Sequence, residues 1–283
     1  MNKILLTGST GFIGSELLKD LSQDNKVYVI LRKKLKNNQR HKNVVQIYYN
    51  NYKNLNNKIK KLKIDTIIHC ATHYVKSHNI QDLEKLSNSN ILFGNIILEN
   101  LKLMGVKKFI NFSTVWENYE GTKGNFYNLY SAYKASFGNI LDFYKKKFDK
   151  IEFLNLVISD TFGSNDQRKK IINLMKSNYK KNLITNIVSK KLYMNLLNVT
   201  DIKIAVRHIL KKRHKSGTYS LQNKKNFKIE DIIKRINKNS NKKIKVKWLS
   251  SEIIKENIYK FKSLKNWNPK NSKIENIVKI ITG

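Results

Sequence analysis

Apolar residues follow two patterns that alternate along the first 160 positions of this chain. Short continuous apolar runs predict buried strands at residues 3–6, 27–31, 44–49, 66–70, 108–112 and 153–158. Between these runs, apolar residues recur every three to four positions, which predicts amphipathic helices at 12–23, 53–62, 80–104 and 128–148. Such alternation predicts an α/β fold with a doubly wound parallel sheet, covered by helices on both faces.

Beyond residue 160 the pattern breaks into shorter pieces. Helices are predicted at 166–179, 201–212, 228–238 and 273–282, and strands at 192–197, 218–221 and 244–248. We therefore expect a large domain over residues 1–160 and a smaller C-terminal lobe over residues 161–283, some elements of which return to the sheet.

A glycine-rich turn joins the first predicted strand to the first predicted helix. It consists of Gly8, Ser9, Thr10, Gly11, Phe12, Ile13 and Gly14. The first amides of a helix have no acceptor within the helix and the helix dipole favours an anion there, so this turn can hold a pyrophosphate. The alternative is a glycine-rich turn without a ligand. The strand before it and the helix after it favour a Rossmann-type NAD(P)-binding domain over residues 1–160, with a substrate-binding lobe after it.

Charge and composition limit the classes of partner. The 283 residues carry a formal net charge of +36, but lysine is spread along the whole chain beside abundant asparagine and isoleucine, and all three residue types have A/T-rich codons. We interpret the charge mainly as a compositional bias that attracts anionic ligands, and we expect no specific nucleic-acid site. No apolar run is long enough for a membrane span, the first strand begins by residue 3, and Cys70 is the single cysteine. These features predict a cytoplasmic protein without a signal peptide.

The end of the second predicted strand bears on the choice of dinucleotide. Domains that prefer NAD usually have a carboxylate there for the ribose 2′-hydroxyl. This chain has Arg32, Lys33 and Lys34 instead. A guanidinium suits a 2′-phosphate through bidentate pairing, so Arg32 favours NADP(H), with NAD(H) as the alternative cofactor. The competing interpretation of Arg32 is one more surface cation in a lysine-rich chain.

A Tyr-x-x-x-Lys spacing supplies the candidate catalytic pair. It occurs at Tyr49–Lys53, Tyr119–Lys123 and Tyr130–Lys134. Only the last pair opens a long amphipathic helix, where residues four apart share a face. A free phenol has a pKa of about 10, and a nearby ammonium favours the phenolate, so the lysine brings the tyrosine closer to a useful range. The alternative is a tyrosine and a lysine that only pack against the protein.

The Gly-x-x-Gly-x-x-Gly spacing of the turn, followed by Tyr130-x-x-x-Lys134, resembles the extended branch of the short-chain dehydrogenase/reductase superfamily, the NAD-dependent epimerases and dehydratases. The resemblance implies that Thr114 is the catalytic hydroxyl, with Ser113 as the alternative, when the match starts from the beginning of the fifth strand. It also implies cofactor contacts from Asn50, Cys70, Ala71, Thr72, Asn90, Tyr130 and Lys134. His69, Cys70 and His73 match no common zinc spacing and lack a fourth ligand, so we expect no metal.

Fragments at 71–74, 109–111, 128–134 and 160–169 resemble a subgroup, the CDP-abequose and CDP-paratose synthases, which reduce a 4-keto group on a CDP-3,6-dideoxyhexose. Phe162, Ser164 and Gln167 depart from that subgroup's pattern. Val115-Trp116 stands where dehydratases of the family carry an Asp-Glu pair, which disfavours dehydration. The substrate contacts that the resemblance implies are Tyr74, Ser113 and Trp116. Arg168 and Lys169, in the first turn of a predicted helix, are candidates to bind the pyrophosphate of the substrate, and the alternative is that they are solvated surface charges.

The resemblance therefore implies an NADP(H)-dependent reductase of the 4-keto group of a nucleotide-activated deoxysugar. It also implies a homodimer formed through the helices at 80–104 and 128–148. One alternative is a nucleotide-sugar 4-epimerase that retains NAD. The other is a non-catalytic protein of the same fold that binds a nucleotide or RNA, against which the intact Thr114, Tyr130 and Lys134 argue.

Overall fold

The computed structural model describes residues 1–33 and 42–283 and divides into two compact units. Unit 1 comprises Met1–Val157, Ile209–Tyr219 and Tyr259–Lys262. Unit 2 comprises Ile158–His208, Ser220–Ile258 and Ser263–Gly283. Lys34, which follows Arg32 and Lys33 in the sequence, lies outside the described residues.

An eight-stranded sheet has the strand order β15-β11-β6-β5-β4-β1-β2-β3. Its strands are β1 (Lys3–Thr7), β2 (Lys26–Leu31), β3 (Val44–Tyr48), β4 (Thr66–His69), β5 (Lys108–Thr114), β6 (Glu152–Ile158), β11 (Gly217–Leu221) and β15 (Lys262–Ser263). β1 pairs in parallel with β2 and β4, and the outer pairs β2–β3 and β4–β5 are also parallel. The chain therefore reverses its winding direction between β1 and β4. This confirms the predicted doubly wound sheet, and the carboxyl ends of β1 and β4 meet where such folds bind ligands.

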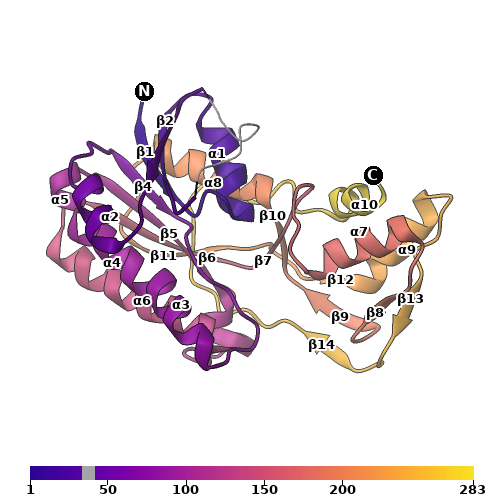
Figure 1. The fold of residues 1–283 in the computed structure, drawn as a ribbon. Helices are drawn as coiled ribbons and strands as arrows, with labels where there is room; N and C mark the ends of the chain where they lie inside the picture. Colours follow the sequence, from indigo (N-terminus) through magenta and orange to yellow (C-terminus); the bar gives the residue numbers. More distant parts are fainter. Residues whose placement is uncertain (34–41) are drawn as a thin grey trace. The chain divides into compact units, whose positions relative to one another are not determined.

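Helices cover the sheet of unit 1 on both faces (Figure 1). On one face lie α2 (Tyr52–Ile59), α4 (Phe93–Glu99), α5 (Leu101–Met104) and α6 (Leu129–Lys147), which share a core with Leu5, Ile67 and Phe109 of the strands. On the other face α1 (Phe12–Leu21) buries its three leucines. Fully buried strands between helical layers explain why the strands appear in the sequence as continuous apolar runs.

The prediction of one continuous helix over residues 80–104 is wrong. The segment contains the 3-10 turn η2 (Ile80–Asp82), α3 (Leu83–Ser87), the π-helical turn η3 (Asn88–Leu92), α4 and α5. The amide of Asn100 donates to Ile96 O at 2.7 Å and to Asn56 Oδ1 at 2.7 Å, which separates α4 from α5. Asparagine side chains compete in this way with the regular hydrogen bonds of a helix. The apolar periodicity of the sequence therefore continues past Asn100, although the regular helix is interrupted there.

Unit 2 has its own apolar core. Its elements are β7 (Asp160–Phe162), α7 (Ile171–Lys181), β8 (Thr185–Ile187), β9 (Lys191–Met194), β10 (Leu196–Asn198), α8 (Val199–Lys211, which ends in unit 1), β12 (Phe227–Lys228), α9 (Ile229–Asn239), β13 (Val246–Trp248), β14 (Ile253–Lys255) and α10 (Ile274–Thr282). Apolar residues of α7, α9 and α10 form one buried cluster with Leu192 and Leu196. None of the helices in the described part of the chain is long and apolar enough to cross a membrane.

The strand predicted at 192–197 is two strands, β9 and β10, which belong to different small sheets. Asn195 separates them. Its amide donates to Asn223 O at 3.0 Å, and its backbone N–H donates to Glu256 Oε2 at 2.7 Å. These partners lie far away in the sequence, so no local pattern announces the break.

Candidate active site

The glycine turn between β1 and α1 is shaped by contacts within the protein at two of its glycines. Gly8 has a φ of 66°, and a Cβ there would lie 2.6 Å from Ala71 N. A Cβ on Gly14 would lie 2.1 Å from Gly8 O. Gly11 differs, because it has an extended backbone and a Cβ there would only reach ordinary contact, 3.4 Å from Gly8 O. The protein itself therefore requires glycine at Gly8 and Gly14, whereas a requirement at Gly11 would come from a bound group.

The same turn offers an anion site at the N-terminus of α1. The N-cap, Gly11, makes no side-chain cap, and the first turn of the helix contains no acidic residue. Ser9 is buried, and its Oγ has no hydrogen-bond partner among the described residues. Thr10 is exposed, and Phe12 and Ile13 are half-buried. A dinucleotide pyrophosphate fits this turn for three reasons. The N-terminus of α1 favours an anion, the buried Ser9 hydroxyl can donate a hydrogen bond to it, and Gly11 leaves space beside the backbone.

The segment after β4 lies directly against this turn. Ala71 N–H donates to Thr7 Oγ1 at 3.1 Å, and the backbone of Cys70 and Ala71 is what a Cβ on Gly8 would strike. Burial raises the pKa of the Cys70 thiol to about 12, so the thiol stays protonated. Cys70 and Ala71 therefore lie beside the glycine turn, and the cofactor contacts of Cys70, Ala71 and Thr72 stay predictions.

Asn90, predicted to act near the cofactor, lies in the π-helical turn η3 and is 3% exposed. Its Oδ1 accepts from Thr72 Oγ1 at 2.8 Å and from His73 N–H at 2.7 Å, and its amide donates to His73 O at 3.0 Å. Its amide group is therefore bonded to the segment after β4, and its action on a cofactor would be to position that segment. π-helical turns of this kind are frequent at functional sites.

Two predicted cofactor residues, Arg32 and Asn50, follow the strands β2 and β3. Arg32 is exposed directly after β2, and its charge lowers the pKa of Tyr49 and Tyr52 against the larger effect of their burial. Asn50 is exposed just after β3. Arg32 therefore follows the carboxyl end of β2, the strand beside β1, and Asn50 follows the carboxyl end of β3, which pairs with β2. Their contact with the adenosine end of a dinucleotide stays a prediction.

The predicted catalytic residues lie at the end of β5 and the start of α6. The helix begins at Leu129 because Asn128 caps it: Asn128 Oδ1 accepts from Ser131 N–H at 3.0 Å. Tyr130 and Lys134 follow one helical turn apart, and Lys134 is 4% exposed. Of the competing pairs, Tyr119 lies in a segment with left-handed residues at Glu120 and Gly121, so its lysine is not one helical turn away.

Thr114 ends β5 and caps the irregular 3-10 segment η4 (Val115–Gly121). Its Oγ1 accepts from Trp116 N–H at 3.3 Å, which leaves the hydroxyl proton to donate. Ser113 is 2% exposed, and its Oγ has no partner among the described residues. Both hydroxyls are thus buried at the strand end.

Glu117 is a site residue that the sequence prediction missed. It is 7% exposed, its Oε1 accepts from Thr114 N–H at 3.5 Å, and its charge acts on Lys134. Burial lowers the pKa of the Lys134 ammonium below its usual range, and the Glu117 carboxylate opposes that effect. Burial likewise raises the pKa of Glu117, against the charge of Lys134. The spacing Thr114-x-x-Glu117 is a capping-box pattern, which is the signal that could have identified it.

A series of aromatic rings begins at Tyr130. Its ring centroid lies 5.1 Å from that of Tyr74, and Tyr74 lies 5.8 Å from Trp116. Trp116 in turn lies 5.2 Å from Tyr127. The two aromatic residues that we predicted as substrate contacts, Tyr74 and Trp116, are therefore joined to the predicted proton donor.

His69 has a structural place in the core. It is 1% exposed, its Nδ1 lies 3.0 Å from Thr7 Oγ1, and its ring lies 5.2 Å from that of Phe137. Burial, assisted by the charge of Lys134, lowers the pKa of His69 to about 3, so the imidazole is neutral. Within residues 1–33 and 42–283, no group of three or more His, Cys, Asp and Glu side chains could hold a metal.

Arg168 and Lys169, predicted in the first turn of a helix, instead precede α7, which begins at Ile171. The reason is the side chain of Asp166, whose Oδ1 accepts from Arg168 N–H at 3.1 Å and from Arg168 Nε at 2.8 Å. Arg168 Nη2 also donates to Thr161 O at 2.9 Å. The guanidinium therefore has internal acceptors, while Lys169 is exposed.

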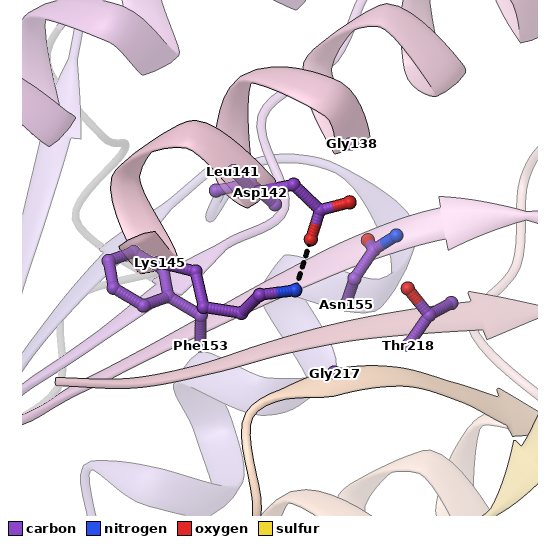
Figure 2. Close-up of a pocket in the computed structure, with 8 residues that line it drawn as sticks. All are labelled: Gly138, Leu141, Asp142, Lys145, Phe153, Asn155, Gly217 and Thr218. Carbon is purple, nitrogen blue, oxygen red and sulfur yellow. Dashed lines mark hydrogen bonds and ion pairs between the residues drawn. The ribbon is translucent and has the colours of Figure 1, made fainter. Parts of the chain in front are cut away.

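A hollow lies away from these residues, beside the second half of α6 (Figure 2). It is lined by Gly138, Leu141, Asp142, Lys145, Phe153, Asn155, Gly217 and Thr218. Asp142 and Lys145 form an ion pair at its edge. None of the residues predicted to contact cofactor or substrate lines this hollow.

Comparisons with known proteins bear on the chemistry of the site. Residues 4–221 match the model of the NAD dependent epimerase/dehydratase family. A protein named CDP-abequose synthase from Yersinia pseudotuberculosis is 26% identical over 242 residues, which covers 83% of this chain and 83% of that protein. Another protein of that name, from Salmonella muenchen, is 22% identical over 249 residues, which covers 87% of this chain and 83% of that protein. The UDP-glucose 4-epimerase of Thermus thermophilus, solved in complex with NAD, has a TM-score of 0.79 at 19% identity over 99% of both chains, so it shares the fold.

Proposed function

The chain belongs to the NAD dependent epimerase/dehydratase family, and from this premise we propose that it reduces the 4-keto group of a nucleotide-activated deoxysugar with NADPH. The relatives named CDP-abequose synthase support a nucleotide sugar as the class of substrate. Val115 and Trp116 after the catalytic hydroxyl support reduction over dehydration, because neither side chain can exchange a proton in a water elimination.

The observation that carries the proposal is the placement of the glycine turn, Cys70, Lys134 and Tyr130 at the carboxyl ends of the strands. Gly8 packs against Cys70 at the end of β4, and the charge of Lys134 acts on Cys70. Lys134 in turn lies one helical turn from Tyr130. A phosphate site, a buried ammonium and a phenol thus share the carboxyl edge of one sheet, which is the arrangement that hydride transfer to a carbonyl needs.

In the proposed reaction NADPH, when bound, supplies the hydride to the carbonyl carbon. Tyr130 donates its proton to the carbonyl oxygen as that oxygen gains negative charge. Thr114 holds the same oxygen by donating a hydrogen bond, with Ser113 as the alternative donor. Lys134 holds the nicotinamide ribose, one helical turn from Tyr130.

The central experiment is Tyr130→Phe, which retains the ring and removes the proton. Turnover of a CDP-linked 4-keto-6-deoxyhexose should fall by about 10²-fold or more, the scale expected for loss of a positioned general acid. NADPH affinity and thermal stability should change little. Tyr133→Phe, three residues further along the same helix, is the matched control and should retain activity. Full activity of Tyr130→Phe on a verified substrate would contradict the mechanism.

NADP(H) as the preferred cofactor rests on Arg32, because no carboxylate follows β2 at that position. The wild-type protein should bind NADPH more tightly than NADH, and Arg32→Asp should narrow or reverse the difference. Lys33→Asp makes the same change of charge at the next exposed residue and should leave the difference nearly intact. Equal dissociation constants of the wild type for the two cofactors would refute this preference and favour NAD(H).

The epimerase alternative makes a different prediction for the same assays. Interconversion of the 4-epimers of a nucleotide sugar without net consumption of NADPH would support it against the reductase. Absence of turnover together with tight NADPH binding would instead favour a non-catalytic role.

We also propose a homodimer formed through the helical face that includes α6. Phe143 on that helix is 59% exposed, which leaves a large apolar ring in water in the isolated chain. Multi-angle light scattering at micromolar concentration should give the mass of two chains, and Phe143→Lys should reduce it toward one. A monomeric wild type would contradict this proposal.

A further inference from the structure

The strands β8 and β13 lie side by side in unit 2 as a two-stranded parallel sheet (Figure 1). Exposed and buried side chains alternate over residues 184–190, as in a strand with one face in water. Apolar residues belong on the buried face of such a strand. Ile184 and Val188 nevertheless lie on the exposed face, with exposed fractions of 59% and 49%.

The pairing of the two strands places a third apolar side chain on the same face. Leu249 N–H donates to Ile187 O at 2.9 Å, so the ladder continues one residue past β13 and Leu249 lies beside Val188. The turn after Leu249 is held against the same strand, because Ser250 Oγ donates to Val188 O at 3.0 Å. Ile253 follows this turn, and Leu249 and Ile253 are 60% and 69% exposed. Four exposed aliphatic residues thus lie in two segments bonded to each other, and we call them the apolar patch: Ile184, Val188, Leu249 and Ile253.

Lysines flank the apolar patch. The two segments that carry it, residues 183–191 and 243–255, contain six lysines and a single acidic residue, Glu252. The whole chain has 56 basic and 20 acidic residues, so the excess of positive charge is locally larger than its composition explains. Lys247 is exposed on β13, and Lys245 is exposed directly before that strand. A group of exposed apolar side chains indicates a binding surface, and the lysines require an anionic partner for it.

The residue types of this surface distinguish between anionic partners. Protein interfaces are enriched in aromatic residues and arginine and depleted in lysine, and single-stranded nucleic acids stack on exposed aromatic rings. Residues 183–191 and 243–255 contain no arginine, and their only aromatic residue, Trp248, is half-buried. A second copy of the chain would bring lysines against lysines, which is unfavourable. An anionic lipid surface suits both residue types, because aliphatic side chains enter the acyl boundary while lysines extend to the headgroups.

We propose that the apolar patch, with Lys245 and Lys247, binds unit 2 reversibly to the surface of a bilayer that contains anionic phospholipids. Peripheral binding of this kind needs no membrane-spanning helix. It is independent of the proposed reaction, since no residue of the patch is a predicted cofactor or substrate contact. Each lysine near an anionic surface should contribute about fivefold in affinity. Each exposed aliphatic side chain should contribute a similar factor when it leaves water.

The experiment measures co-sedimentation of the whole chain with vesicles of phosphatidylcholine that contain about one-third phosphatidylglycerol. The wild type should bind these vesicles and should not bind vesicles of phosphatidylcholine alone. Leu249→Ser/Ile253→Ser should weaken binding by about 10- to 30-fold at any salt concentration, because it removes apolar contacts. Lys245→Gln/Lys247→Gln should weaken binding by about 25-fold at low salt, and this difference should shrink as salt screens the charges.

Matched controls make the same changes outside the apolar patch. Leu103→Ser/Ile204→Ser replaces two aliphatic residues that are 57% and 45% exposed on α5 and α8. Lys60→Gln/Lys61→Gln removes two exposed charges after α2. Both controls should bind the anionic vesicles as the wild type does. Melting temperatures establish that each variant is folded, which the exposure of all the substituted side chains leads us to expect.

Several results would overturn the inference. They are absence of wild-type binding to the anionic vesicles, and unchanged binding in Leu249→Ser/Ile253→Ser. An equal loss in Lys60→Gln/Lys61→Gln would show adsorption through the overall charge of +36 and not through this surface.

Two further measurements test the other occupants of the apolar patch. Leu249→Ser/Ile253→Ser should bind a labelled single-stranded RNA as weakly as the wild type does, and a loss matching that on vesicles would refute the assignment to lipid. Light scattering without lipid should give this variant the same mass as the wild type. A lower mass would assign the surface to a second copy of the chain and would also refute the proposal.

Discussion

Gly14→Ala tests the packing of the glycine turn, on which the proposed cofactor binding depends. Gly14 lies in the first turn of α1, and an added Cβ would lie 2.1 Å from Gly8 O, 2.7 Å from Gly8 C and 3.0 Å from Ser9 Cα. All three are backbone atoms of the turn itself, so no side chain can rotate away. The turn must move away from the helix by about 1 Å or more to restore ordinary contact distances.

The net effect on stability combines two terms. Overpacking of this kind costs about 1–3 kcal/mol, and the backbone position of the struck atoms favours the upper end. Alanine gains about 1 kcal/mol over glycine in a helix interior, which offsets part of the loss. A net destabilisation of about 2 kcal/mol should lower the melting temperature by roughly 4–8 °C for a domain of this size. NADPH should also stabilise the variant less than the wild type, because the displaced turn binds the pyrophosphate more weakly.

Gly138→Ala is the matched control, since it makes the same change inside another helix of unit 1. A Cβ on Gly138 would lie 3.6 Å from Asn155 Nδ2 at the hollow beside α6, which is an ordinary contact (Figure 2). This variant should gain up to about 1 kcal/mol and melt at a slightly higher temperature than the wild type. Differential scanning fluorimetry with and without NADPH measures both effects. Equal melting temperatures of Gly14→Ala and the wild type would refute the packing argument.

Three further predictions concern the site and the surface. Glu117→Gln removes a negative charge that favours the protonated form of Lys134, so the pKa of Lys134 should fall further. Turnover should then decline at a lower pH than in the wild type. Coincident pH–rate profiles of the two proteins would count against this coupling. Thr114→Ala should impair turnover while leaving NADPH affinity unchanged, and an active Thr114→Ala beside an inactive Ser113→Ala would assign the catalytic hydroxyl to Ser113. Duplex DNA should bind weakly and lose its affinity steeply with salt in fluorescence anisotropy; nanomolar affinity for one particular RNA at physiological salt would favour the nucleic-acid alternative.

Local sequence patterns were sufficient for the parts of the site that depend on neighbouring residues. The strand, glycine turn and α1 follow one another within a few positions, and the order of burial along β1 and α1 follows the apolar pattern. The start of α6 could be predicted for the same reason, because Asn128 caps the helix through a residue only three positions later. The placement of Tyr130 and Lys134 on one helix therefore required no knowledge of the tertiary structure.

Contacts between distant segments account for what the sequence did not predict. The π-helical turn at Asn88–Leu92 accompanies the bonds of Asn90 to Thr72 and His73, which lie seventeen or eighteen positions away. The helix at α7 begins late because Asp166 binds the side chain of Arg168. The capping pattern could have indicated Glu117, but its burial beside Lys134 depends on how β5 and α6 pack, which no single segment encodes.

The division of the chain has a consequence for making fragments of this protein. A gene fragment ending near residue 160 would encode β1 to β6 but would lack β11, the strand that borders β6 in the sheet. The backbone of β6 would then become an unpaired edge beside residues as apolar as Phe153, Leu154 and Leu156. Lys108 would lose its acceptors, Ile209 O and Lys212 O, and would keep only its ion pair with Glu152 in a buried position. An exposed apolar edge of this kind promotes self-association, so the fragment should be insoluble when truncated there, and the sheet requires the later part of the chain to fold.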